Sequence, residues 1–267
     1  MWISALVTLL NLALAATVGV RLLRRARDAE GGPEVWLAGY FLCGAFFGSM
    51  INIVVYSSLG PGGMSFDPAT AARLLTVSTA ANGVAGTCVY VFTWRTFHPG
   101  AAWARTLVAG AIAIFAGAWL AQLATGGFAV VVFPGAAYWI ERGAFCAAFL
   151  WAAVESFRYY GALRKRLRLG LAEPVVVNRF WLWGLWAAAT GALALSDLVA
   201  RIAYVWTTGE TTVLIVERAM PIIVVTVAVT ALIGAVAAAS LWLTFFPNRR
   251  YVRWIESQQA KRAAEPV

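Results

Sequence analysis

The sequence predicts an all-α integral membrane protein: a seven-transmembrane-helix bundle with its N-terminus outside the cell and its C-terminus in the cytoplasm. The chain of 267 residues is 61% hydrophobic and 12% charged, whereas soluble domains are about half apolar and about a quarter charged. Its apolar residues form seven continuous runs, each close to or above the roughly 20 residues that a spanning helix needs. Basic residues gather in alternate connections between these runs, which is the pattern of cytoplasmic loops.

Short connections rich in glycine and proline separate the seven runs. The predicted spans are 2–20, 33–56, 71–94, 101–124, 137–157, 180–204 and 212–246. Continuous apolar runs favour helices over the alternating strands of a membrane barrel. The last run is long, and we expect it to begin at the surface and enter the bilayer near Met220 and Pro221, because proline favours a helix start or a kink. Residues 1–247 are then the membrane domain and residues 248–267 a cytoplasmic tail.

The positions of the basic residues predict the orientation. Most of the 21 lysines and arginines fall in or beside four segments that a seven-span chain places on one side: 21–27, 95–105, 158–179 and 249–262. The alternate connections carry none, and these are 57–70, 125–136 and 205–211. Because cytoplasmic loops are enriched in lysine and arginine, the first group is predicted to be cytoplasmic.

The segment after the last span predicts a short amphipathic helix on the inner leaflet. Tyr251, Trp254 and Ile255 fall at positions i, i+3 and i+4, with arginines between and around them. This arrangement places the apolar side chains on one helix face. A frayed basic tail is the alternative.

Charged and polar residues near the predicted outer ends of several spans form the candidate ligand-binding site. Charges at membrane depth are costly and usually face a bundle interior or a wet cavity. The candidate residues are Asn52, Arg73, Asn82, Gln122, Glu141, Arg142, Asp197, Arg201, Glu217 and Arg218. Their four arginines exceed their three acids by one, which suits a small anionic ligand. The structural alternative is a set of ion pairs that lock helix ends together, or arginines that reach to lipid phosphates.

Glu155 lies apart from this set, in the inner half of the fifth predicted span. It is a candidate proton site on a transport path. The alternative is a local ion pair with Arg158, three residues later.

Several classes of protein are set aside by what the sequence lacks. Both lysines, Lys165 and Lys261, lie outside the predicted spans, so an ordinary retinal Schiff base is excluded. The single histidine, His98, is in a Pro-Gly turn and is expected to be solvated. The three cysteines match no metal or redox spacing. We therefore expect no metal, no cofactor, no nucleic acid and no enzymatic activity.

Two segments, 164–180 and 245–251, resemble a group of uncharacterised bacterial seven-helix membrane proteins. The resemblance covers about a fifth of the chain, supports the predicted topology and implies no activity. The many alanines and arginines, with few lysines, are typical of a GC-rich bacterium, and we expect the chain in the bacterial cytoplasmic (inner) membrane.

The first functional hypothesis is a receptor-like or sensory protein that binds a ligand in an outward-facing polar pocket. Its cytoplasmic partner would contact the basic 158–179 connection and the C-terminal tail, and a homo-oligomer is a further expectation. The alternatives are a small transporter or proton-conducting protein, and a structural or pigment-binding subunit of a membrane complex.

Overall fold

The computed structural model describes residues 2–28, 32–57, 66–126, 128, 135–209 and 216–264. Within these ranges the chain forms eight helices and no strand. The second helix is continuous, but its helix type changes along its length. It consists of the α-helical α2 (Glu34–Gly39), the π-helical η1 (Tyr40–Gly48) and the α-helical α3 (Ser49–Ser57). The others are α1 (Trp2–Asp28), α4 (Pro68–Phe97), α5 (Ala102–Ala124), α6 (Ala136–Arg168), α7 (Pro174–Thr208), α8 (Val216–Phe245) and α9 (Arg249–Ala264).

Five helices in the described part of the chain are long and apolar enough to cross a membrane. They are Glu34–Val55, Ala69–Phe97, Ala102–Ala124, Pro174–Thr208 and Ala228–Phe245. The outer surfaces of the bundle agree, since α5 exposes Ile112, Leu120 and Leu123 and α8 exposes Val225 and Leu232. Large apolar side chains in such numbers are favourable on a surface that faces lipid. The chain therefore has the features of a helical membrane protein.

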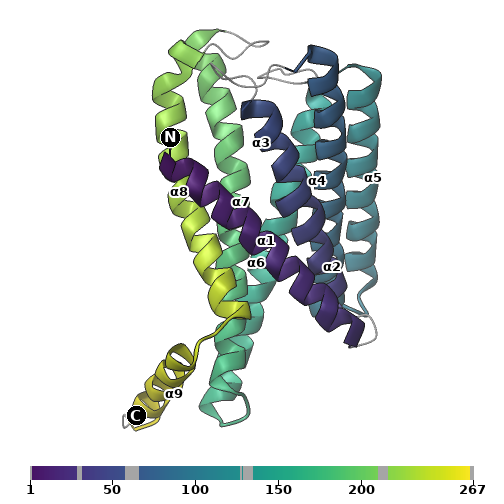
Figure 1. The fold of residues 1–267 in the computed structure, drawn as a ribbon. Coiled ribbons are helices and arrows are strands. Elements are labelled where there is room, and N and C mark those ends of the chain that lie inside the picture. The colour runs from purple at the N-terminus through teal and green to yellow at the C-terminus, as the bar shows by residue number, and fades with distance from the viewer. Residues whose placement is uncertain are drawn as a thin grey trace.

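The long helices α4, α5, α6, α7 and α8 stand side by side and alternate in direction, and α1 runs obliquely across the bundle (Figure 1). The ends of α3, α5 and α7 and the starts of α4, α6 and α8 share one end of the bundle, which is the upper end in Figure 1. The main core lies between α1, η1, α4, α6 and α7, where Val18, Phe41, Val89 and Phe149 are buried. Tyr90 ties α4 to α6, because its hydroxyl donates to the Ala144 carbonyl at 3.0 Å.

The prediction that residues 158–179 form a connection between two helices is wrong. Helix α6 continues to Arg168 and α7 begins at Pro174, so all the basic residues of this segment lie on helices. Hydropathy detects the apolar part of a helix and misses a polar extension of the same helix. A glycine ends α6: Gly170 has φ +70°, and the Leu171 N–H donates to the Arg166 carbonyl at 2.9 Å. This is a helix C-terminus that favours glycine.

The start of α4 is fixed by a side-chain cap. The Asp67 carboxylate accepts hydrogen bonds from the backbone N–H groups of Ala69 and Thr70, each at 3.0 Å, and Pro68 occupies the first helical turn. The hydrogen bonds from Thr70 hold the pKa of the Asp67 carboxyl below its ordinary value.

A helix after the last span is confirmed as α9. Asn248 caps it by accepting from the Tyr251 N–H at 2.7 Å, Tyr251 stacks on Trp254, and Ile255 is buried. The Asn178 amide donates to the Tyr251 hydroxyl at 2.7 Å and ties α9 to α7. Pro221 lies inside α8, which begins at Val216. The prediction of a helix start at Pro221 is therefore wrong. The surface segment predicted before residue 216 lies outside the described residues.

The glycines of η1 allow the second helix to approach α4 closely. A methyl group at Gly44 would overlap the Ala85 side chain, and one at Gly48 would lie 3.1 Å from Asn82 Oδ1. The Gly44-x-x-x-Gly48 spacing predicts such close contact between helices, and here the contact is within one chain.

We expect Gly44→Ala to lower the free energy of unfolding by about 1–2 kcal/mol, because the added methyl group forces helices apart. Gly110 on α5 is the matched control, since a methyl group there meets no atom within 4 Å. Gly110→Ala is expected to stabilise by roughly 0.5–1 kcal/mol through helix propensity. Equilibrium unfolding in detergent measures both, and effects of the same sign would contradict the packing described for Gly44.

Candidate ligand-binding cavity

A cavity of about 450 Å³ lies inside the bundle and is lined by residues from α1, the second helix, α4, α5, α6, α7 and α8. Its walls combine charged and amide side chains with aromatic rings. Six of the ten predicted site residues line it, and these are Asn52, Asn82, Gln122, Arg142, Asp197 and Arg201. Cavities of this size are typical of small-molecule sites.

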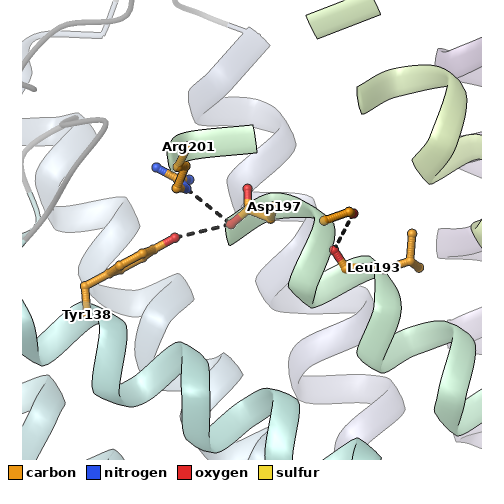
Figure 2. Close-up of polar contacts among 5 residues, drawn as sticks. Tyr138, Leu193, Asp197 and Arg201 are labelled. Atoms are coloured by element: carbon orange, nitrogen blue, oxygen red, sulfur yellow. Dashed lines mark hydrogen bonds and ion pairs between the residues drawn. The ribbon is translucent and has the colours of Figure 1, made fainter. Parts of the chain in front are cut away.

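Tyr138 and Asp197 connect α6 to α7 at the charged end of the cavity (Figure 2). The Tyr138 hydroxyl donates to Asp197 Oδ2 at 3.3 Å, and Arg201 Nε donates to the same oxygen at 3.2 Å. Asp197 and Arg201 are one turn apart with the acid first, which is the favourable order in a helix. The predicted pairing of these two residues is therefore confirmed.

Among the described side chains, Arg142 is the cation of this end that has no carboxylate within ion-pair distance. Its guanidinium lies 5.3 Å from the centre of the Tyr138 ring, and the Arg201 guanidinium lies at the same distance from that ring. Arg142 Nε is buried and has no hydrogen-bond partner among the described residues, and no described carboxylate lies within 4.0 Å of it. An unsatisfied buried N–H costs about 1–3 kcal/mol, so this group favours an acceptor supplied from outside the chain.

Glu141 faces away from the cavity and pairs with α5. Its side chain is 4% exposed, and its Oε2 accepts from the Gln122 amide at 2.7 Å. Adjacent residues on a helix point about 100° apart, so Glu141 and Arg142 reach different neighbours. The sequence placed Glu141 in the site; in the structure it supports the wall through Gln122.

Asn52 and Asn82 meet at Ser78 between the second helix and α4. The buried Ser78 hydroxyl lies 2.8 Å from Asn52 Oδ1 and 3.0 Å from the Gly48 carbonyl, and the Asn82 amide donates to Ser78 at 3.4 Å. The two amides are thereby held at the cavity wall, where each keeps further hydrogen-bonding capacity.

Aromatic rings form the other wall. Trp186 on α7 is 4% exposed and contacts Tyr40, Phe41 and Phe149, with ring centres 5.5–5.8 Å apart. Two of these partners, Tyr40 and Phe41, come from η1. Long π-helical segments are rare, and π geometry is frequent at functional sites.

The remaining predicted site residues do not line the cavity. Arg73 is exposed on α4, where it lies near Asp67. The side chains of Glu217 and Arg218 lie outside the described residues. The role of these ten residues in ligand binding stays a prediction.

Glu155 lies on α6 outside the cavity and contacts two basic residues. Its carboxylate is 3.4 Å from Arg158 Nη1 and 3.2 Å from His98 Nε2. The expected ion pair with Arg158 is present. The prediction that His98 is solvated is wrong, because its side chain is 24% exposed and packs between Trp103 and Trp151. A turn motif predicts the local backbone and says nothing of the helix that packs against it.

Tyr138 is the main site residue that sequence reasoning missed. It precedes Arg142 by four residues, so both occupy one face of α6, and this spacing was the available signal. Trp186 is both a buried core residue and part of the cavity wall. Tyr40 and Phe41 carried no signal, because nothing in their sequence context marks a π-helix.

No family model matches the chain, and neither the curated proteins nor the solved structures contain a significant match. The cavity and its side chains are therefore the basis for any statement of function.

Proposed function

We propose that the protein is a receptor-like, sensory membrane protein that binds a small anionic ligand in the bundle cavity. The observation that carries the proposal is Arg142, a half-buried cation at the wall of a 450 Å³ cavity whose buried Nε–H has no partner among the described residues. The neighbouring acid, Asp197, already accepts from Tyr138 and Arg201. A ligand with a negative charge would satisfy Arg142 where the chain does not.

The topology we propose is a seven-span bundle in the bacterial cytoplasmic membrane, with the N-terminus outside. Arginine-rich segments at one end of the bundle support it, since α6 ends in Arg164–Arg168 and α9 carries Arg249, Arg250 and Arg253. The charged end of the cavity lies toward the opposite end, near the start of α6 and the end of α7. A ligand would then enter from outside, and a cytoplasmic partner would contact the basic end of α6 and α9.

A binding screen tests this function. The full chain in lipid nanodiscs is heated with a panel of small carboxylates, phosphates, amines and neutral compounds, and its unfolding temperature is followed. We expect an anionic class to raise this temperature by several degrees and Arg201→Ala to abolish the rise. Arg73→Ala is the control, because Arg73 is exposed outside the cavity. The proposal fails when no class of compound gives a shift that depends on Arg201.

Transport is the second candidate, and the contact between Glu155 and His98 supports it, because a carboxyl and an imidazole can both carry a proton. The His98–Glu155–Arg158 group lies further along α6 than the charged end of the cavity, so the two groups could serve as steps of a proton path. Proton flux into liposomes distinguishes the functions. Under transport, Glu155→Gln and Asp197→Asn each reduce flux at least tenfold, whereas ligand binding without flux supports the receptor.

A further inference from the structure

The residues that line the cavity on α7 extend from Trp186 to Arg201, with different chemistry at the two ends of this stretch. Trp186, Thr190, Asp197 and Arg201 all line it from one face of this helix. Trp186 and Asp197 are 11 residues apart, which corresponds to about 16 Å at the helical rise of 1.5 Å per residue. A ligand that fills the cavity therefore meets a charged layer and an apolar layer separated by about that distance.

Arg142 lies in the same layer of the cavity as Asp197. Its positive charge is the one that the described acids of this layer leave unmatched. Its guanidinium lies over the Tyr138 ring, and the hydroxyl of that ring donates to Asp197. Arg201 is already paired with Asp197 at 3.2 Å. Among the described residues, the Arg142 guanidinium has no carboxylate within ion-pair distance and its Nε has no hydrogen-bond partner, which suits a single negative charge. A guanidinium recognises a carboxylate through parallel N–H donors.

The apolar layer is built from rings that offer no charge. Tyr40 and Phe41 line the cavity together with Trp186. Phe145 also lines it, one turn along α6 from Arg142, between the charged layer and these rings. The lining residues of α8 are small, since they include Gly234, Ala237 and Ala238, and the Asn11 amide of α1 lies beside Gly234. This part of the wall suits a slender apolar chain.

Resting on the ligand-binding function proposed above, we infer that the cavity takes an elongated amphiphilic monoanion of the medium-chain carboxylate class. The carboxylate lies at Arg142 and the chain runs along α7 toward Trp186. A neutral alcohol of the same length binds less well, because its hydroxyl can accept from the Arg142 N–H but carries no negative charge to offset the guanidinium.

The test uses ω-bromoundecanoate and the matched ω-bromoundecanol, since bromine quenches tryptophan fluorescence on contact. Each is titrated into the full chain in nanodiscs, and the saturable part of the quenching is measured against the non-saturable part from compound dissolved in the bilayer. The acid is expected to give saturable quenching at a concentration at least tenfold lower than the alcohol. Trp186→Phe is expected to remove most of the saturable quenching by the acid.

Arg142 variants assign the charge preference to this residue. Arg142→Gln is expected to remove the advantage of the acid over the alcohol. Arg142→Lys, which keeps the charge, retains at least part of that advantage and shows that the effect does not come from misfolding.

Equal saturable quenching by acid and alcohol in the unaltered chain overturns the inference and leaves the cavity as a binding site for another ligand. Saturable quenching that persists in Trp186→Phe overturns the orientation. Failure of the ligand-binding function is a separate result, since it requires that no compound in the thermal screen binds in an Arg201-dependent way.

Discussion

Trp186→Ala is expected to lower the free energy of unfolding by about 3 kcal/mol, at the lower end of the range for truncation of a large core side chain. Trp186 is in ring contact with Tyr40, Phe41 and Phe149, so its loss removes contacts between η1, α6 and α7 at once. In a membrane, the Trp186 side chain is buried from lipid and not from water. The free energy of transferring its apolar surface is therefore small. The lost packing contacts remain, and they are a main source of stability between membrane helices.

Trp206 provides the matched control, because it is on the same helix and is 87% exposed. Trp206→Ala removes the same group from a position without comparable packing, and we expect a change below about 1 kcal/mol. Reversible unfolding in sodium dodecyl sulfate, followed by circular dichroism, measures both variants. Equal effects at the two positions would show that Trp186 does not hold the bundle together at the cavity.

Gln122→Leu is expected to destabilise the protein by about 2 kcal/mol, because it leaves a buried acceptor without its donor. The Gln122 amide donates to Glu141 at 2.7 Å, and the Glu141 side chain is almost fully buried. This hydrogen bond joins α5 to α6 directly behind the cavity wall. Loss of the amide alone is more harmful than loss of both groups, since two apolar side chains can pack together without an unsatisfied oxygen.

A double-mutant cycle separates this hydrogen bond from the other contacts of the two residues. The variants are Gln122→Leu, Glu141→Leu and the combination. We expect the combined loss to be smaller than the sum of the single losses by at least about 1 kcal/mol, as for residues in direct contact. Additive losses would mean that the two side chains act independently.

The sequence predicted the helical membrane character and much of the charged end of the cavity. The Asp197–Arg201 pair follows from a spacing of four residues on one helix, and the depth of Arg142 follows from its place within an apolar run. The amphipathic pattern at Tyr251, Trp254 and Ile255 was sufficient to predict α9. In each case the signal is local, because helical periodicity relates residues that are close in the sequence.

Contacts between distant helices could not be predicted in the same way. The partner of Glu141 is Gln122 on another helix, and the partner of Glu155 includes His98 at the end of α4. Both depend on how the helices rotate against one another, which a single sequence does not encode in any local pattern. The polar ends of α6 and α7 were mistaken for a loop for a related reason: a helix that leaves the bilayer loses its apolar signal and keeps its backbone hydrogen bonds.

The proposed side of ligand entry depends on which end of the bundle faces the outside of the cell. Single cysteines at Ala69 and Arg166 report the two ends, since both residues are exposed, at the start of α4 and at the end of α6. The native Cys43, Cys88 and Cys146 are first replaced by alanine. In intact cells, a membrane-impermeant maleimide is expected to label Ala69→Cys at once and Arg166→Cys only after the membrane is opened. Labelling of both positions in intact cells, or of Arg166→Cys alone, would contradict the outward-facing cavity.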